Sequence, residues 1–337
     1  MTKKITAILL AGGESSRFWP LDHKMLLPFL GKPLLQWQLE QLVKLGFSKI
    51  IVVANKNNVE EISRLTKTLQ IKPIIVRQVG RGQESAILSV KEVIYEEPLI
   101  ILNSSDIYED SFILELLSSW QKQSDKIFLG AVKITSYFPG GYLKLGKDGL
   151  IKDIIEKPEP GKEPSEIIRV NADIFPSAKL IIDSIIDQHD GSDLGYEPAI
   201  ISLIKKGFEC QAFIKDTSWK YLKYPWHVLE VTEKLLGSIT SQNIGQNVKI
   251  AKHVVLEGPM IIEDNVIISD FTKIIGPCYI GKNTVIGNNN IIRASHIGAD
   301  CVTGFNTDIA RSYIGNNCWF HSNYVGDSVI EGDVSMG

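Results

Sequence analysis

The sequence predicts an α/β domain with a mostly parallel sheet, followed by a parallel β-helix. Strand-like and helical segments alternate through much of the first 240 residues, and aliphatic residues then recur at every sixth position from Ile244 to Ile292. Alternating β and α units favour a parallel sheet that is covered on both faces. A period of six fits neither a helix nor a simple strand, but it fits short strands that form the sides of a triangular coil. We therefore expect two domains, residues 1–240 and 241–337.

The first domain is predicted from its apolar runs and helical periodicities. One pattern places Leu35, Leu39 and Leu42 along a single helix face and ends at Gly46. The last helical pattern, 227–242, looks like a connector to the second domain. The predicted strands cover 5–10, 49–54, 73–76, 99–103 and 127–134, and the other predicted helices cover 34–45, 58–69, 84–93 and 111–122.

The second domain is predicted from its repeat. Gly, Asn and Asp fill the intervals between the aliphatic positions, and after Ile292 the phase slips by one residue. Each short strand would place its aliphatic residue inside the coil. The positions in phase are Ile244, Ile250, Leu256, Ile262, Ile268, Ile274, Ile280, Ile286 and Ile292.

Composition excludes several classes of protein. The chain has 337 residues, 44% of them hydrophobic, and a net charge of −3, which provides no basic surface for general nucleic-acid binding. Its four cysteines form no CxxC pair, which argues against a zinc site and for a reducing compartment. The opening segment reads as a core strand rather than a signal peptide, and no run approaches the roughly 18 apolar residues of a membrane span. We expect a cytoplasmic protein.

A glycine-containing turn follows the first strand. The strand 4–10 runs into Ala11-Gly12-Gly13, and Arg17 and Lys24 follow. Glycine lets backbone N–H groups approach an anion closely, while arginine offers a planar fork to phosphate oxygens and lysine a mobile point charge. The spacing is neither that of a P-loop nor GxGxxG. The turn is therefore predicted to bind phosphate groups.

This segment closely resembles the signature of the sugar-1-phosphate nucleotidyltransferases. The resemblance implies a Rossmann-like domain that joins a nucleoside triphosphate to a sugar 1-phosphate and releases pyrophosphate. It assigns nucleotide binding to Leu10, Ala11, Gly12, Gly13 and Ser16, and charge stabilisation in catalysis to Arg17 and Lys24. The matching residues are Leu10, Ala11, Gly13, Ser16, Arg17, Pro20, Leu21, Lys24, Leu26, Pro28 and Gly31-Lys32-Pro33.

A metal site is predicted at the carboxyl end of the strand 99–103. Asp106 offers a carboxylate there, which suits Mg²⁺. Where the resembling family has a second metal-binding acid, this chain has His227, and imidazole suits Mn²⁺ or Co²⁺ better than Mg²⁺. Either His227 binds such an ion, or Asp106 and substrate phosphates hold Mg²⁺ alone, or catalysis is impaired. A further alternative is a histidine at a helix start with no ligand role.

Shorter motifs resemble the base and sugar sites of the family. Gln78 and Gly82 match the base-reading segment, although the spacing is one residue short and Gln83-Glu84 replace its Thr-Ala. The family's sugar-phosphate elements are matched by Gly141, Glu156, Lys157 and Asn171. Lys157 is the catalytic candidate among them, because its positive charge suits the phosphate group that attacks.

The repeat region resembles the left-handed β-helix of hexapeptide-repeat proteins, which usually trimerise. We therefore expect a homo-oligomer, a trimer through the β-helix. The stretch His321–Asp327 resembles an element of bifunctional N-acetylglucosamine-1-phosphate uridyltransferases, and Arg293 lies where that family binds phosphate. Ala310 occupies the place of the expected lysine, so we interpret this region as a scaffold.

The predicted reaction uses UTP or dTTP with glucose 1-phosphate or N-acetylglucosamine 1-phosphate. A mannose-1-phosphate guanylyltransferase is an alternative, prompted by the AGG…WPL sequence of the loop. A non-catalytic, nucleotide-sugar-binding regulatory relative is a second alternative. Such relatives typically lose the loop arginine and lysine, which are both present here as Arg17 and Lys24.

Overall fold

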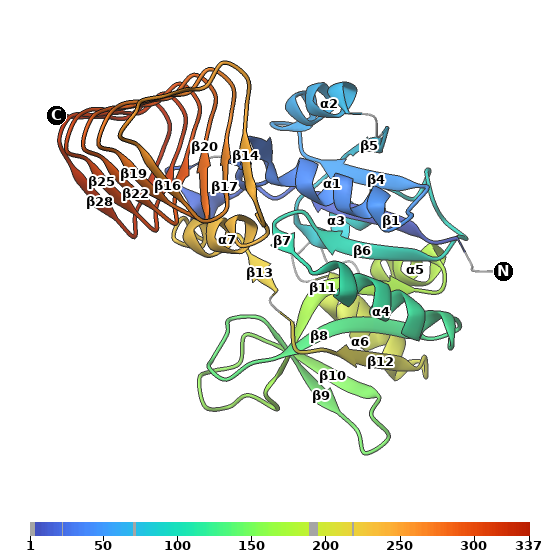
Figure 1. Ribbon diagram of the computed structural model, residues 1–337. Helices are drawn as coiled ribbons and strands as arrows, with labels where there is room; N and C mark the ends of the chain where they lie inside the picture. Colours follow the sequence, from blue (N-terminus) through green and yellow to red (C-terminus); the bar gives the residue numbers. More distant parts are fainter. Residues whose placement is uncertain (1–3, 22, 70–71, 189–194, 218) are drawn as a thin grey trace. The chain divides into compact units, whose positions relative to one another are not determined.

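The computed structural model describes residues 4–21, 23–69, 72–188, 195–217 and 219–337 (Figure 1). The chain divides into two compact units. The first unit contains Met1–Glu14 and Leu35–Trp219, and the second contains Ser15–Leu34 and Lys220–Gly337. The segment that follows the first strand therefore groups with the C-terminal part of the chain. The domain boundary at residue 240 remains a prediction from the sequence patterns.

A nine-stranded sheet forms the centre of the first unit. Four parallel strands lie in the order β6, β1, β4, β5, and β11 runs antiparallel beside β6. β8 continues the sheet from β11 and pairs with β12 in parallel, while β9 and β10 form an antiparallel extension. The strands are β1 (Thr6–Ala11), β4 (Ile50–Ala54), β5 (Ile74–Arg77), β6 (Leu99–Asn103), β8 (Ile127–Lys133), β9 (Gly141–Leu145), β10 (Ile151–Glu156), β11 (Ile167–Phe175) and β12 (Cys210–Ile214).

Helices cover both faces of this sheet (Figure 1). Ile8 and Leu10 of β1 share a core with side chains of α3, α5 and α6, whereas Ala7 and Leu9 are also buried but lie outside that core. Successive residues of a strand point to opposite faces, so both faces are covered and the predicted α/β fold is confirmed. The helices are α1 (Leu34–Lys44), α2 (Val59–Thr68), α3 (Gly82–Leu88), α4 (Asp110–Gln121), α5 (Ala178–Gln188) and α6 (Tyr196–Lys205).

One predicted helix of the first unit differs from its observed bounds by more than one residue. The pattern predicts a helix over 84–93, but α3 starts at Gly82 and ends at Leu88. Beyond it, the amides of Val90 and Lys91 bond to carbonyls three residues back, to Ile87 and Leu88. Such tighter turns end the α-helix while keeping the chain coiled, which is why the apolar period continues past the helix.

Three parallel sheets form the β-helix of the second unit, as the repeat predicts. In the six-residue period, Ile262, Ile268, Ile274, Ile280, Ile286 and Ile292 all lie in its buried core. The prediction is wrong for Ile244 and Ile250, which are 43% and 41% exposed because they lie in the first coil, at the open edges of their sheets. The first sheet contains β14 (Gln242–Ile244), β17 (Met260–Ile262), β20 (Cys278–Ile280), β23 (His296–Ile297), β26 (Tyr313–Ile314) and β29 (Val329–Ile330). The second contains β15 (Lys249–Ile250), β18 (Ile267–Ile268), β21 (Val285–Ile286), β24 (Val302–Thr303), β27 (Trp319–Phe320) and β30 (Ser335–Met336). The third contains β16 (Val255–Glu257), β19 (Lys273–Ile275), β22 (Ile291–Arg293), β25 (Asp308–Ala310) and β28 (Tyr324–Gly326).

The corners of the β-helix explain the asparagines of the repeat. Asn265, Asn283 and Asp300 adopt left-handed backbone conformations, which Asn and Asp tolerate better than most residues. Their side chains form a ladder, with Asn265 donating to Asn283 at 3.1 Å and Asn283 donating to Asp300 at 2.9 Å. The ladder ties successive coils together at one corner.

The phase slip of the repeat corresponds to a shorter coil. Met260 pairs with Cys278, but Tyr279 pairs with His296, so the later coil has one residue fewer. The aliphatic residues remain inside, because Ile280 pairs with Ile297 and then Ile314.

The second unit also contains elements before the β-helix. These are η1 (Ser16–Phe18), η2 (Lys24–Leu26), β2 (Pro28–Phe29), β3 (Lys32–Pro33), β13 (Lys220–Tyr221) and α7 (His227–Leu236). The sequence predicts the connecting helix over 227–242, but α7 stops at Leu236 and β14 begins at Gln242. Between them, the amides of Ser238 and Ile239 bond to carbonyls three residues back, so tighter turns replace the α-helix. Among the described residues, no helix has the length and apolar character needed to cross a membrane.

Candidate functional site

The glycine turn after β1 is fixed by two asparagines. The Nδ2 atom of Asn55 donates to the carbonyl of Gly12 at 3.0 Å, and Nδ2 of Asn58 donates to the carbonyl of Ala11 at 2.8 Å. Both asparagines follow the neighbouring parallel strand β4. The sequence analysis missed them, although a cluster of asparagines at the carboxyl end of a strand is a signal that could have found them.

Gln78 and Gly82 lie close to Gly12. A Cβ atom on Gly12 would lie 1.8 Å from Oε1 of Gln78, so a larger residue at position 12 would force this glutamine side chain to move. Nε2 of Gln78 donates to the carbonyls of Gly82 at 2.9 Å and Gly80 at 3.3 Å. The turn between β5 and α3 thus packs onto the glycine turn after β1.

Asp106 begins the short strand β7 (Asp106–Ile107), which follows β6. It is buried, and its backbone carbonyl accepts a hydrogen bond of 2.6 Å from Nε2 of Gln38, which also donates to the carbonyl of Asn103 at 3.1 Å. Gln38 on α1 therefore fixes the turn that carries the predicted metal ligand. The sequence analysis did not single out Gln38.

Tyr108 connects this turn to the predicted sugar site. Its hydroxyl lies 3.3 Å from Oδ2 of Asp106 and donates to the carbonyl of Asn171 at 2.7 Å. Burial, together with the nearby charge of Asp106, raises the pKa of Tyr108 well above 10. The hydroxyl therefore stays protonated and acts as a donor at neutral pH.

Gly141, Glu156 and Lys157 lie together at the end of the β9–β10 extension. Gly141 and Glu156 are cross-strand partners, and a Cβ atom on Gly141 would lie 3.2 Å from Oε2 of Glu156. The Lys157 amide donates to the carbonyl of Gly140 at 3.0 Å, and its Nζ lies 3.2 Å from Oε1 of Glu156. A carboxylate and an ammonium group are therefore adjacent and partly exposed.

Asn171 on β11 is oriented by Arg169. Nη2 of Arg169 donates to Oδ1 of Asn171 at 2.6 Å. A guanidinium group can only donate, so the amide oxygen must face Arg169 and the NH₂ group must face away from it. Asn171 therefore presents a hydrogen-bond donor on its other side.

Arg169 belongs to a buried charged cluster that the sequence analysis missed. Its Nη2 lies 3.2 Å from Oε1 of Glu197, and its Nε lies 3.5 Å from Oδ2 of Asp173, which accepts a 2.7 Å bond from the hydroxyl of Tyr196. Burial raises the pKa of Asp173 to about 6, although the charge of Arg169 acts in the opposite direction. Burial opposes the charge of Arg169, but Asp173 and Glu197 outweigh it and raise the arginine pKa. The cluster keeps the arginine fixed and charged.

The remaining predicted residues lie in the second unit. Ser16 and Arg17 are in η1 and are exposed, and Lys24 starts η2 and is half-buried. Each short helix buries an apolar neighbour, Phe18 in η1 and Met25 in η2. These buried apolar neighbours hold the two short helices in place.

His227 is the first residue of α7 and is buried. Its Nδ1 atom accepts hydrogen bonds from the amides of Lys223 at 3.1 Å and Tyr224 at 3.2 Å. Burial lowers the pKa of His227, as do Lys223 and Lys24, while Glu230 raises it. The neutral ring must then carry its proton on Nε2, which leaves no lone pair for a metal. These contacts favour the alternative of a helix-start histidine, and a ligand role remains a prediction.

Substitution of His227 tests this assignment. We expect His227→Asp to leave the preference among Mg²⁺, Mn²⁺ and Co²⁺ unchanged, because the histidine offers no lone pair to a metal in this arrangement. His227→Ala is expected to lower the free energy of unfolding by about 2 kcal/mol, since two backbone donors lose their acceptor. Metal titrations of turnover and urea unfolding measure the two effects. A move of the preferred ion toward Mg²⁺ in His227→Asp would show that His227 is a ligand after all.

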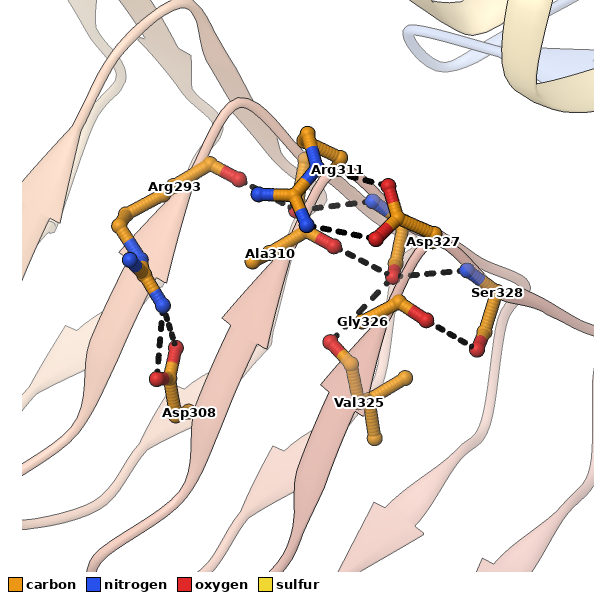
Figure 2. Close-up of polar contacts among 10 residues, drawn as sticks. Arg293, Asp308, Ala310, Arg311, Val325, Gly326, Asp327 and Ser328 are labelled. Carbon is orange, nitrogen blue, oxygen red and sulfur yellow. Dashed lines mark hydrogen bonds and ion pairs between the residues drawn. The ribbon is translucent and has the colours of Figure 1, made fainter.

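The arginines of the β-helix form ion pairs between coils. Nη2 of Arg293 donates to both carboxylate oxygens of Asp308, at 2.8 and 2.7 Å (Figure 2). Arg311 instead uses two nitrogens, with Nε donating to Oδ1 and Nη2 to Oδ2 of Asp327 (Figure 2). Carboxylates from neighbouring coils are thus the partners of both guanidinium groups. Arg293, the residue that the resemblance relates to phosphate binding, serves here as a tie between strands.

Two family models match the chain. The model described as "Nucleotidyl transferase" matches residues 6–220, and the model described as "Bacterial transferase hexapeptide (six repeats)" matches residues 259–294. The first match spans the sheet of the first unit, and the second spans coils of the β-helix.

Individual proteins are also similar. A protein of Sulfurisphaera tokodaii named "Bifunctional sugar-1-phosphate nucleotidylyltransferase/acetyltransferase" is 30% identical over 98% of this chain and 80% of that protein. A "Bifunctional protein GlmU" of Methanococcus maripaludis is 28% identical over 78% of this chain and 61% of its own length. The solved structure of an apo UDP-glucose pyrophosphorylase superposes with a TM-score of 0.59 at 19% identity, covering 69% of this chain and 98% of that one. This last likeness concerns the fold alone.

Proposed function

The chain belongs to the nucleotidyl transferase family, and we propose that it acts as a sugar-1-phosphate nucleotidyltransferase. A sugar 1-phosphate attacks the α-phosphorus of a nucleoside triphosphate, and pyrophosphate leaves with the electrons of the broken P–O bond. The observation that carries the proposal is the connection through Tyr108, whose hydroxyl links the turn of Asp106 to Asn171. Tyr108 would then hold the metal-binding carboxylate of Asp106 near the backbone of Asn171, whose side chain would bind the sugar.

The triphosphate is assigned to the glycine turn and two cations. Backbone groups of Leu10, Ala11, Gly12 and Gly13, with Ser16, would bind it, and Arg17 and Lys24 would stabilise the negative charge that develops on it. Such a reaction requires alignment and charge neutralisation rather than a protein nucleophile. The asparagine bonds to the carbonyls of Ala11 and Gly12 support a preorganised turn.

Asp106 suits a divalent cation, Mg²⁺ in the first place and Mn²⁺ or Co²⁺ as alternatives. Mg²⁺ commonly takes one or two carboxylates and completes its shell with phosphate oxygens and water. Among the described residues, no group of three or more His, Cys, Asp or Glu side chains could hold a metal. When bound, the cation would neutralise charge on the phosphates.

The sugar phosphate is assigned to Gly141, Glu156, Lys157 and Asn171. Glu156 can accept hydrogen bonds from sugar hydroxyls, and Asn171 can donate through the NH₂ group that faces away from Arg169. Lys157 would position the attacking phosphate. Gln78 and Gly82 would contact the base, and we propose UTP or dTTP with glucose 1-phosphate or N-acetylglucosamine 1-phosphate. The name of the Sulfurisphaera tokodaii protein supports a sugar 1-phosphate as one of the substrates.

We also propose that copies associate through the β-helix as a trimer and that the protein is cytoplasmic. Exposed apolar side chains on the coils, including Phe271, Ile291 and Phe305, support association. The free state of Cys210, Cys278, Cys301 and Cys318 supports a reducing compartment.

A substrate panel tests the activity. Purified protein with Mg²⁺ or Mn²⁺ is given UTP, dTTP, GTP, ATP or CTP with each of several sugar 1-phosphates, and pyrophosphate release is measured. We expect the highest kcat/KM with UTP or dTTP. Highest efficiency with GTP and mannose 1-phosphate would reassign the substrates. No release in any combination, together with tight binding of a nucleotide sugar, would refute the transferase in favour of a regulatory relative.

A further inference from the structure

The segment that carries Lys24 continues directly into a tight hairpin. β2 (Pro28–Phe29) and β3 (Lys32–Pro33) pair antiparallel, and the two residues between them, Leu30 and Gly31, have φ values of 48° and 77°. Positive φ at both positions is typical of a type I′ turn. The amide of Leu27 donates to the carbonyl of Lys24, and the amide of Leu34 donates to the carbonyl of Leu27. The hairpin and the lysine therefore form one connected piece of backbone.

Three aromatic side chains form a ladder on the outer face of one β-helix sheet. Tyr279, His296 and Tyr313 pair in register on β20, β23 and β26, with ring centroids 4.8 and 4.6 Å apart. Each precedes an inward isoleucine, so each points outward from its coil. Burial lowers the pKa of His296 to about 4, so the ladder is uncharged at neutral pH.

The ladder is covered, although corresponding positions on the other two sheets are not. Its three members are at most 2% exposed. Trp319, which precedes the inward Phe320, is 53% exposed, and Tyr324, which precedes the inward Val325, is 66% exposed. Something must therefore cover this sheet of the β-helix specifically.

The hairpin contacts both ends of the ladder. The Tyr313 hydroxyl donates to the carbonyl of Pro28 at 2.8 Å, and the Phe29 ring lies 5.6 Å from the Tyr313 ring. At the other end, a Cβ atom on Gly31 would lie 2.7 Å from the Tyr279 hydroxyl and 2.9 Å from Oε1 of Glu263. A side chain at position 31 would force these two groups to move, and its φ of 77° also disfavours any residue other than glycine.

We propose that the β-helix positions the triphosphate-binding segment, and that Tyr313 is a positioning residue that acts through Pro28 on Lys24. The inference rests on the proposed function in one respect, the assignment of Lys24 to the triphosphate. A cation that is held before the ligand arrives loses less conformational entropy on binding, so anchoring the hairpin favours binding of the nucleotide. The β-helix then contributes to nucleotide affinity without contacting the nucleotide through its own strands.

Tyr313→Phe tests the proposal, because it keeps the stacked ring and removes the hydroxyl that bonds to Pro28. We expect KM for the nucleoside triphosphate to rise about five- to tenfold, the effect of losing one hydrogen bond, with kcat little changed. Partial misfolding alone would instead lower the apparent kcat at constant KM. Hydrogen exchange at the amides of Leu27 and Leu34 should become faster. Gly31→Ala should act in the same direction, because both its φ and its surroundings disfavour a side chain.

Trp319→Phe is the matched control, since it changes an outward aromatic ring on a neighbouring sheet of the same β-helix. It should leave KM and exchange at Leu27 and Leu34 at wild-type values. If Tyr313→Phe also matches the wild type in both measurements, the proposal is overturned. Faster exchange with an unchanged KM would equally overturn the role in nucleotide binding. If the wild type itself releases no pyrophosphate with any substrate pair, the proposed function fails, while the exchange measurement still decides whether Tyr313 anchors the segment.

Discussion

Replacing Asp106 with alanine is expected to lower kcat for pyrophosphate release at least about 100-fold, the loss typical of a group that stabilises charge in the transition state. The carboxylate is buried at the end of β6, and Gln38 fixes the backbone that carries it. Lys24→Ala should lower kcat by a similar factor, because the triphosphate would then lose the positive charge of Lys24. Saturating concentrations of metal and both substrates separate kcat from weakened binding.

Asp110→Ala is a suitable control for the first variant. Asp110 lies four residues further along the chain on α4, where its carboxylate pairs with Lys44 at 2.7 Å and accepts a bond from Gln41. It should retain kcat within about twofold, as surface substitutions usually do. If Asp106→Ala turned over as fast as Asp110→Ala, Asp106 would have no part in the reaction.

Replacing Arg169 with alanine should lower the free energy of unfolding by about 3–5 kcal/mol, because it leaves two carboxylates in a buried site without their cation. Asp173 is completely buried, and Glu197 lies within 3.2 Å of the same guanidinium group. The amide of Asn171 also loses the donor that orients it, so KM for the sugar 1-phosphate should rise in the fraction that remains folded. Urea unfolding and steady-state kinetics measure these two effects.

A surface ion pair provides the comparison for Arg169. Lys133 and Glu166 lie 3.0 Å apart, but their side chains are 66% and 71% exposed, so Lys133→Ala should cost less than about 1 kcal/mol. The double variant Arg169→Met with Asp173→Leu should recover part of the loss, because apolar side chains need no partner in that site. An Arg169→Ala cost no larger than that of Lys133→Ala would mean that the cluster contributes little to stability.

The parts of the fold that follow from local patterns were predictable. β1, β4 and β6 fall within one residue of the predicted runs, because buried parallel strands read as continuous apolar segments. β5 also falls within one residue, although it is a partly exposed edge strand. The β-helix core follows from its period of six, since each turn of the coil repeats the same inward position. Gly82 was predictable for a related reason, because it lies in a local turn and its φ of 83° is one that residues other than glycine rarely adopt.

The parts that depend on long-range hydrogen bonds were not predictable. Asn55, Gln38 and Tyr108 are ordinary polar residues in the sequence, and they acquire their roles only by bonding to backbone carbonyls of distant segments. Arg169 and Asp173 lie four residues apart on β11 and could belong to a solvated face of that strand, yet both are buried. The role of His227 was predicted from the metals that imidazole binds. The structure adds two backbone amides that donate to its Nδ1 atom, and these decide which ring nitrogen carries the proton.

The bond from Tyr313 to Pro28 joins residues 285 positions apart, and this separation has a consequence for protein synthesis. On the ribosome, the N-terminal part of a chain emerges and folds first. Here the lysine-bearing segment leaves the exit tunnel long before the coil that holds it has been translated. Nascent chains released before residue 313 would have this segment without its anchor, so full nucleotide affinity should arise only late in translation.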